Sequence, residues 1–306
     1  MIDHATVVIR GAHERTEVVC FELVKEQFPA ERIILIHERP FTTALRRSFE
    51  IGIERGMEWT LCLDADVLIR QRAISDLLEA VSALPADTLG GSGYVFDKLR
   101  DGRRPGGLHL YRTSLLPHAL SFIPAPSSAL RPETHVKQCM ESSGHPWKLL
   151  DMTLGLHDFE QFYSDIFRKA LVRARKSSSL NETMLRKALL QAKSDTDFLV
   201  VSWGMRVGMN LTDQIDLDSK QWASEANILL LANDMREKNE MKIEQGRILV
   251  EKLYANLSLQ QSSRLQVDGT LQSDKRNRIF AWVWKLGWWI TQFGTRVQMA
   301  GFRRIH

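Results

Sequence analysis

Short apolar segments alternate with amphipathic segments in the first part of the chain. Residues 5–10 (Ala-Thr-Val-Val-Ile-Arg) and residues 32–37 (Arg-Ile-Ile-Leu-Ile-His) are apolar runs with the length of buried strands. Residues 15–28 and 42–55 carry apolar positions at the spacing of helices that are packed on one face. Because helices separate the strands, the pattern predicts a parallel sheet that is covered by helices.

The hydrophobic pattern changes after residue 88. Glycine-rich segments at 90–93 and 102–107 border short strand-like pieces, and helical patterns dominate after residue 132. The strongest of these predict helices over residues 132–143, 158–175 and 180–193 and a long, mostly helical stretch over residues 221–257. We therefore expect four parts: an α/β domain over residues 1–175, a helical extension over 176–257, a polar linker over 258–274 and a tail over 275–306.

The tail concentrates basic and aromatic residues. The whole chain has a net charge of +4, but residues 275–306 hold seven basic residues and no acidic one, which leaves the rest at −3. Its apolar residues recur on one narrow helix face: Ile279, Val283, Leu286, Ile290, Phe293 and Val297. We expect this helix to lie on an anionic membrane surface. The alternative is a helix that docks on the α/β domain or on a second copy in a homo-oligomer. The regular apolar stripe argues against a nucleic-acid partner.

Cysteine usage and hydropathy favour a cytoplasmic location. The three cysteines, Cys20, Cys62 and Cys139, have no paired spacing, so neither a disulfide framework nor a zinc knuckle is predicted. No uninterrupted apolar run approaches the ~20 residues that span a bilayer. We therefore expect a protein of a reducing compartment that binds peripherally to the inner face of the membrane.

Residues 58–68 (Glu-Trp-Thr-Leu-Cys-Leu-Asp-Ala-Asp-Val-Leu) combine a buried strand with two aspartates, Asp64 and Asp66. The spacing of two residues puts both carboxylates on one face of a strand. At the end of a strand they can converge on a hard divalent cation such as Mg²⁺ or Mn²⁺. Open α/β sheets bind their ligands at these strand ends. The alternative is a solvated acidic turn.

Three further features follow the two aspartates in order. Gly106 and Gly107 precede the strand-like segment Leu108-His-Leu-Tyr-Arg, Glu133 lies in Arg-Pro-Glu-Thr, and His157 lies in Gly-Leu-His-Asp. In order and spacing, residues 5–175 resemble the GT-A fold nucleotide-sugar glycosyltransferases, in particular their inverting bacterial branch. This resemblance implies an α/β fold, with a Rossmann-like mixed sheet flanked by helices and followed by a helical C-terminal extension.

The resemblance also implies roles for these residues. Asp66 would be a direct metal ligand, Asp64 would lie near both the metal and the ribose, and His157 would complete the metal shell. The alternative for His157 is an ordinary loop or helix-capping residue. Gly106 and Gly107 would line the sugar site.

Glu133 would be the general base on the acceptor hydroxyl. The family's usual Glu-Asp pair is Glu133-Thr134 here, so Asp97 and Glu141 remain competing candidates. Glu133 could instead be a first-turn acid that the helix dipole stabilises.

We expect residues near the first two strands to bind the donor. Glu38, in His-Glu-Arg after the second strand, is the candidate for the nucleobase contact. Arg10, and Arg46 or Arg47, could reach the ribose or the phosphates. The alternative for the arginines is a solvated helix face.

The sequence therefore predicts a metal-dependent glycosyltransferase. It would use Mn²⁺ or Mg²⁺ to move a sugar from a nucleotide diphosphate donor to a glycan or lipid-linked acceptor. Two alternatives stay open: a sugar-phosphate nucleotidyltransferase, and a degenerate GT-A domain that acts as a scaffold. Residues 10–16 match the nucleotide loop of the nucleotidyltransferases poorly.

Overall fold

The computed structural model describes residues 4–100, 102–126, 128–129, 131–176, 181–211 and 222–256. The chain divides into two compact units, Met1–Tyr254 and Ala255–His306. Nearly all described residues belong to the first unit. The predicted linker at 258–274 and the predicted tail helix at 275–306 lie outside the described residues. No helix in the described ranges is long and apolar enough to cross a membrane.

The described residues form one mixed sheet with the strand order β2-β1-β3-β6-β5-β7-β4. Its strands are β1 (Ala5–Arg10), β2 (Ile33–Ile36), β3 (Trp59–Asp64), β4 (Val67–Ile69), β5 (Gly90–Asp97), β6 (Gly102–Arg112) and β7 (Trp147–His157). The pairs β1–β2, β1–β3 and β5–β7 are parallel, whereas β6 and β4 run antiparallel to their neighbours. As a result, β1, β2, β3, β5 and β7 all point in one direction. The predicted α/β fold with a mixed sheet is confirmed.

The short link between β3 and β4 shapes this sheet. Only Ala65 and Asp66 separate the two strands, yet β4 pairs with β7 at the far end of the strand order. In a flat sheet, neighbouring strands are about 4.8 Å apart, so two linking residues could not cross the three strands, β6, β5 and β7, that separate β3 from β4. The sheet must therefore curl, and the curl brings Asp66 beside His157, the register partner of Val67.

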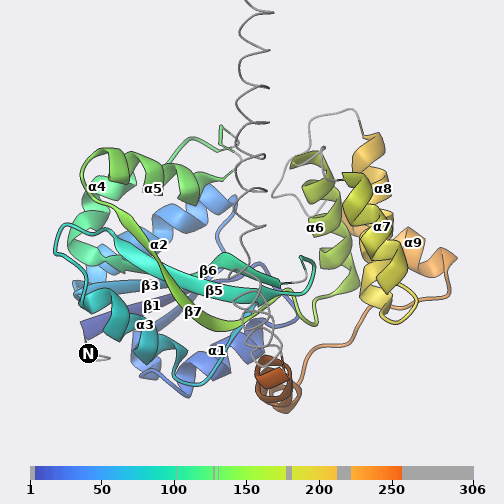
Figure 1. Ribbon diagram of the computed structural model, residues 1–306, viewed down its shortest axis with the longest axis horizontal. Coiled ribbons are helices and arrows are strands. Elements are labelled where there is room, and N and C mark those ends of the chain that lie inside the picture. The colour runs from blue at the N-terminus through green and yellow to red at the C-terminus, as the bar shows by residue number, and fades with distance from the viewer. Residues whose placement is uncertain are drawn as a thin grey trace, which may run out of the picture. The chain divides into compact units, whose positions relative to one another are not determined.

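Helices cover both faces of the sheet. In Figure 1, α2, α4 and α5 lie on one side of the sheet, and α1 and α3 lie on the other. These helices are α1 (Glu17–Lys25), α2 (Phe41–Arg55), α3 (Ala73–Ser82), α4 (Leu116–Ser121) and α5 (Pro132–Ser142), with the short 3₁₀ turns η2 (Ala30–Arg32) and η3 (Thr113–Leu115). Strand β1 is buried along its whole length, which explains its continuous apolar run. Under α2, α4 and α5, the core includes Phe49, Tyr111 and Met140.

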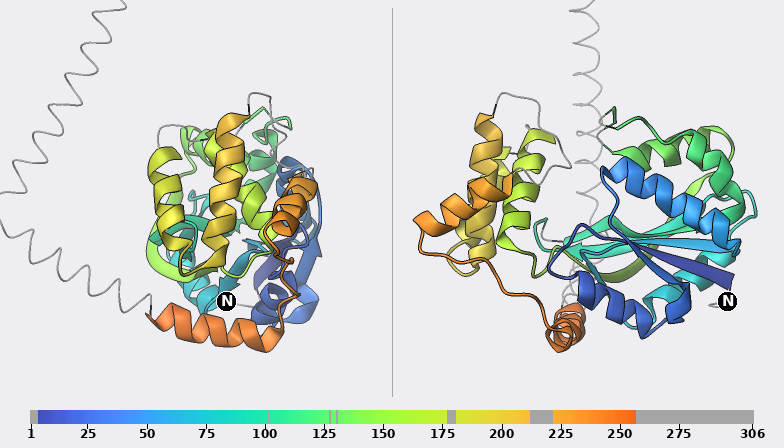
Figure 2. Two further views of the ribbon diagram at one scale, coloured as in Figure 1. Left: turned by 90° about the vertical axis from the view of Figure 1, so that its right-hand side faces the viewer. Right: turned by 180° about the vertical axis from the view of Figure 1, so that it is seen from behind.

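A second group of helices follows β7. It contains α6 (Tyr163–Lys176), α7 (Asn181–Gln191), α8 (Thr196–Asn210) and α9 (Ala223–Ala232), which lie together in Figure 2. Their shared core includes Phe167, Leu171 and Met205. A further helix occupies residues 243–256.

The structure differs from the sequence prediction in three of these segments. The helix expected over residues 158–175 begins only at Tyr163, because Asp158 and Glu160 have positive φ angles of 60° and 59° that a helix does not accept. Strand β7 was not predicted. The long helix expected over 221–257 is interrupted by residues 233–242, which are not helical.

Helices α6 and α8 approach closely because α8 carries two glycines. A Cβ atom at Gly204 would lie 2.3 Å from the Phe167 carbonyl oxygen, and one at Gly208 would lie 2.4 Å from the Leu171 carbonyl oxygen. Real Cβ atoms do not come this close to backbone, so any side chain here must push the two helices apart.

We expect Gly204→Ala to lower the free energy of unfolding by about 1–3 kcal/mol, the usual cost of overpacking. Denaturant unfolding measures this loss. The control is Asn210→Ala, at an exposed position on the same helix. Equal stability of the Gly204→Ala variant and the native chain would contradict the close packing of α6 and α8.

Candidate functional site

The carboxyl ends of four strands meet at one edge of the curled sheet. Arg10, Asp64, Asp97 and His157 are the last residues of β1, β3, β5 and β7, which run in the same direction. All four side chains line a cavity of about 860 Å³. Helix α5 contributes Glu133 and other residues to it, and α6 also lines it. The observed strand order therefore collects charged side chains from distant parts of the sequence at one site.

Asp66, His157 and Asp158 form a compact cluster in this cavity. His157 Nδ1 lies 3.0 Å from Asp158 Oδ2, and His157 Nε2 lies 3.5 Å from Asp66 Oδ2. Burial opposes a charge on His157, but the charges of Asp158 and Asp66 outweigh it and raise the pKa of the imidazole to about 9. The side chain of Lys169 joins the cluster from α6, with Nζ 2.6 Å from Asp66 Oδ2 and bonded also to Asp158 Oδ1.

This cluster has the donor chemistry of a divalent-cation site. Asp66, His157 and Asp158 each offer one ligand atom, and these atoms lie within 4.8 Å of one another. The Asp66 Oδ1 atom is buried and has no hydrogen-bond partner, and such an orphaned acceptor has a place in a metal shell. Two carboxylates and one imidazole suit Mn²⁺ better than Mg²⁺, which prefers oxygen ligands. The residues therefore fit a divalent ion.

Asp158 and Lys169 were not among the residues predicted from the sequence. Asp158 directly follows the predicted His157. Its left-handed φ of 60° changes the direction of the chain after β7, next to the β3–β4 link that contains Asp66. The Asp158 amide donates to the Asp66 carbonyl oxygen at 3.3 Å. Only the curl of the sheet, which local sequence patterns do not encode, brings these residues together.

Asp64 lies apart from this cluster, on the guanidinium of Arg10. Arg10 Nε and Nη2 are 2.9 and 2.8 Å from Asp64 Oδ1. The Arg10 side chain is 3% exposed, whereas that of Asp64 is 30% exposed. Asp64 therefore faces the cavity from the end of β3, while the aspartate two residues later faces β7.

Glu133 lies at the centre of a second charged group. Its Oε1 atom accepts from Tyr111 Oη at 2.6 Å and from Arg10 Nη1 at 3.3 Å. Its Oε2 atom lies 3.1 Å from His109 Nε2 and 3.9 Å from Lys137 Nζ. Burial alone would raise the pKa of Glu133, but these partners outweigh it and hold the pKa well below its usual range. Glu133 is therefore an ionised anchor for several cavity side chains.

His109 and Lys137 extend this group. Burial lowers the pKa of His109 well below 6.5, and its Nε2 atom lies against the Glu133 carboxylate. Its Nδ1 atom is 2.9 Å from Lys137 Nζ, which also lies 4.0 Å from the centre of the Trp147 ring. Burial lowers the pKa of Lys137 to about 8. Arg10 and Lys137 thus carry the positive charge near the Glu133 carboxylate.

The other predicted donor residues are only partly brought together. Glu38, Gly106 and Gly107 line the cavity. Gly107 has a φ of 82°, and a Cβ atom there would lie 2.5 Å from Val67 Cγ2, so this position requires glycine. Arg46 is exposed on α2 and is not among the cavity-lining residues.

Three of the alternative candidates are also placed. Arg47 pairs with Glu54 at 2.7 Å on the exposed part of α2. Glu141 is exposed on α5, whereas Asp97 lies in the cavity with its Oδ2 atom 2.5 Å from Arg104 Nε.

Two further residues that line the cavity, Glu14 and Arg39, were not predicted from the sequence as site residues. Burial, followed by the charge of Asp66, raises the pKa of Glu14 to about 7. Arg39 follows Glu38, and its Nη2 atom donates to the Ala12 carbonyl oxygen at 3.1 Å. This bond ties the loop after β1 to the loop after β2 at the edge of the cavity.

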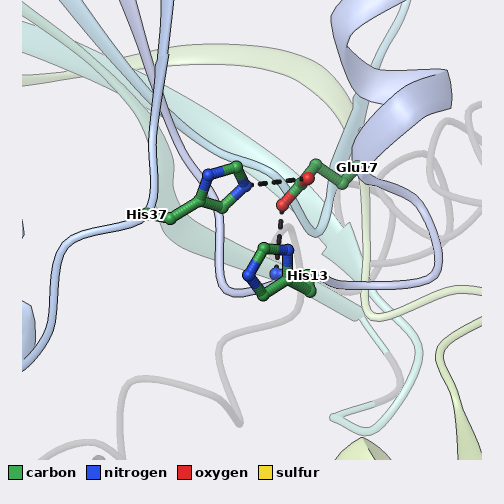
Figure 3. Close-up of side chains that lie close together, drawn as sticks. All are labelled: His13, Glu17 and His37. Atoms are coloured by element: carbon green, nitrogen blue, oxygen red, sulfur yellow. Dashed lines mark hydrogen bonds and ion pairs between the residues drawn. The ribbon is translucent and has the colours of Figure 1, made fainter.

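A second cluster of possible ligands lies beside these two loops. Figure 3 shows His13, Glu17 and His37, with His37 Nε2 2.9 Å from Glu17 Oε1 and the His13 amide donating to Glu17 Oε2 at 3.0 Å. The two rings are stacked, with centroids 4.3 Å apart and planes 18° from parallel. A metal lies in the plane of each ring that binds it, so nearly parallel stacked rings cannot share one ion. Of the two clusters, only Asp66, His157 and Asp158 is arranged for a cation.

No protein-family model matches the chain, and none of the curated proteins matches it. Among solved structures, the chain is similar to a glycosyltransferase involved in the glycosylation of the major capsid of PBCV-1. That match has 16% identity and a TM-score of 0.35, and covers 48% of this chain and 81% of that one.

Two other solved structures are similar at the same level. The mannosyltransferase PcManGT from Pyrobaculum calidifontis, in complex with GDP-Man and Mn²⁺, matches with 12% identity and a TM-score of 0.36, over 84% of this chain and 80% of that one. CMP:2-keto-3-deoxy-manno-octonic acid synthetase, complexed with CTP, matches with 13% identity and a TM-score of 0.34, over 50% and 92%. At such TM-scores these similarities assign no activity to the chain.

We expect Glu133→Gln to lower the free energy of unfolding by about 3 kcal/mol, because it leaves the charges of Arg10 and Lys137 without their buried carboxylate. Because the pKa of Glu133 is lower in the folded protein, its ionised carboxylate stabilises the fold at pH values above the ordinary pKa of 4.5. This stabilisation is lost as the pH falls below 4.5 toward the pKa of the folded protein. The stability difference should therefore shrink in acid. Denaturant unfolding at several pH values measures it.

The matched control is Glu141→Gln, on the exposed part of the same helix. It should change stability little at any pH. A loss as large as that of Glu133→Gln would contradict the anchoring role of Glu133.

Proposed function

We propose that this protein is a metal-dependent glycosyltransferase that uses a nucleotide diphosphate sugar as its donor. One observation carries the proposal: a cavity at the carboxyl edge of an α/β sheet holds a carboxylate–imidazole cluster beside several cationic side chains. Such edges are where open α/β sheets bind nucleotides. The cations Arg39, Arg104 and Lys137 in the cavity lining suit a ligand with several negative charges.

The donor would extend along the edge of the sheet. Its nucleobase would lie near Glu38, in the loop after β2. Its ribose would lie near Arg10 and Asp64, the last residues of β1 and β3. Its diphosphate would lie at Asp66, at His157, which ends β7, and at Asp158, which follows it. When bound there, Mn²⁺ or Mg²⁺ would neutralise the charge that develops on the leaving diphosphate.

The sugar would lie near Gly106 and Gly107. Both glycines line the cavity.

The general base would be a carboxylate that lines the cavity. The resemblance gives this role to Glu133, whose oxygens already accept from Tyr111 and Arg10 and contact His109. A carboxylate held this firmly in its ionised form is a weak base. In the proposed enzyme, Glu133 therefore first holds Arg10 and His109 in place. Asp97 remains the competing acid in the cavity, where it is paired with Arg104.

We expect Asp66→Asn to lower the rate of sugar transfer by about 10²–10³-fold, because it removes an anionic ligand of the metal while preserving shape. The assay offers a panel of nucleotide diphosphate sugars with Mn²⁺ and measures release of the nucleoside diphosphate. Asp87→Asn, at an exposed position, is the control and should retain native rates. Full activity of Asp66→Asn would contradict the proposal.

The same assay separates the alternative activity. A sugar-phosphate nucleotidyltransferase would instead consume a nucleoside triphosphate and a sugar phosphate and release pyrophosphate. Pyrophosphate release without nucleoside diphosphate release would replace the glycosyltransferase assignment. If neither pyrophosphate nor a nucleoside diphosphate is released from any substrate pair, the result favours the scaffold alternative.

The acceptor is proposed to be a glycan or a lipid-linked molecule at the cytoplasmic face of the membrane. Its support is the sequence of residues 275–306, whose seven basic residues and apolar helix face suit an anionic membrane surface.

We expect the full chain to sediment with anionic vesicles at low salt and less at high salt, because salt screens the attraction of its basic residues. A chain truncated after Asp274 should stay in the supernatant. Uncharged phosphatidylcholine vesicles are the control. Equal sedimentation of both chains would remove the membrane from the proposal without affecting the donor site.

A further inference from the structure

The ammonium group of Lys169 pairs with two of the carboxylates that would hold a divalent cation, those of Asp66 and Asp158. Its Nζ atom lies 2.6 Å from Asp66 Oδ2 and also bonds Asp158 Oδ1. The side chains of Lys169, Asp66 and Asp158 are 18%, 13% and 7% exposed, so these ion pairs are largely shielded from water. Burial opposes the charge on Lys169, but Asp158 and Asp66 outweigh it and raise the pKa of the ammonium above its usual value.

An ammonium and a divalent ion cannot use these oxygens together. A metal ion lies about 2.0–2.2 Å from its carboxylate oxygens, and Lys169 Nζ already lies 2.6 Å from Asp66 Oδ2. The two cations would be in contact and would repel each other in a site of low dielectric. An ion that takes either of these two oxygens therefore requires Lys169 to leave that aspartate.

Helix α6 holds Lys169 firmly in reach of this cluster. Phe167 and Leu171 flank it in the sequence and are fully buried in the core shared with α8. The carbonyl oxygens of the same two residues are those approached by Gly204 and Gly208. The backbone at Lys169 is thus fixed by packing, and only the flexible side chain is able to move aside.

We propose that Lys169 is a built-in competitor of the divalent cation, and that it releases the aspartates when the ion arrives with a diphosphate. This inference rests on the proposed function, because it assigns the cluster to the same metal and donor. Lys169 lines the cavity, so its displaced ammonium stays beside the position proposed for the diphosphate. There it gains a new anionic partner.

This exchange makes the metal and the diphosphate bind cooperatively. Metal alone must break buried ion pairs that nothing replaces, which weakens its binding. When a diphosphate is present, the displaced lysine is paired again and the loss is recovered. By linkage, each ligand then raises the affinity of the other by the same factor. Lys169 would act as a positioning residue that makes the site accept metal only together with its donor.

The direct test is titration calorimetry of the full chain with Mn²⁺ alone. We expect Lys169→Met to bind Mn²⁺ at least about tenfold more tightly than the native chain, because no ammonium competes. Lys169→Gln, which keeps a polar group, provides a second variant should the methionine variant fold poorly. Lys169→Arg keeps the charge and should retain weak binding.

The matched control is Arg173→Met, one turn further along α6. Arg173 lines the same cavity and donates to the Leu99 carbonyl oxygen at 3.2 Å, so its removal changes the net charge by the same amount. If Arg173→Met tightens Mn²⁺ binding as much as Lys169→Met, the effect is a general electrostatic one and the competition is overturned.

The second readout is the coupling between metal and nucleotide. Each of ADP, CDP, GDP and UDP is titrated with and without Mn²⁺. For the nucleotide that binds most tightly, the factor by which Mn²⁺ raises its affinity is compared between the native chain and Lys169→Met. This factor should fall in Lys169→Met by about the factor gained for Mn²⁺ alone. Unchanged Mn²⁺ affinity in both uncharged Lys169 variants overturns the inference, even where metal-dependent sugar transfer confirms the proposed function. If the native chain transfers no sugar but Lys169→Met still binds Mn²⁺ more tightly, Lys169 remains a competitor of the ion and the enzyme assignment is overturned.

Discussion

The two-residue link between β3 and β4 is the constraint on which the site depends. A chain that leaves β3 at Asp64 and enters β4 at Val67 can reach the far end of the sheet only if the sheet curls. The register of β4 with β7 then sets Val67 opposite His157. Once this closure is made, the aspartate in the link has a histidine, a second aspartate and a lysine as neighbours.

Buried charge is the second organising principle. The cavity contains two groups of charges, one centred on Glu133 and one on Asp66, and each pairs carboxylates with cations at short distances. Such pairs give little net stability, since desolvation offsets much of their attraction, but removing one member is costly. An arrangement of this kind keeps charged side chains fixed while they remain able to exchange partners with a charged ligand.

Much of the fold follows from local sequence patterns. The first two strands, helices α1 and α2 and the end of β3 at Asp64 all follow from apolar periodicity and helix-ending residues. The cavity likewise contains the predicted Asp66, Glu133 and His157. What could not be predicted depends on contacts between distant residues. Strand β7 has an ordinary mixture of polar and apolar residues and is defined by pairing with β5 and β4. Lys169 belongs to a helix whose sequence gives no sign that one of its lysines points at a carboxylate pair. Arg46 shows the converse, since a plausible ligand by position in the sequence lies on an exposed helix face.

The left-handed backbone at Asp158 limits what evolution can place there. With φ at 60°, the position favours glycine, asparagine and aspartate, and it strongly disfavours β-branched residues. Its contacts with His157 and Lys169 require a negative charge. Asparagine would satisfy the backbone but not the charge, and glutamate would keep the charge on a longer side chain that is less common at this φ. Divergence at this position should therefore be narrower than at Asp66, whose backbone imposes no such restriction, and aspartate at 158 would be a sharper marker for related sequences than the two aspartates at the end of β3.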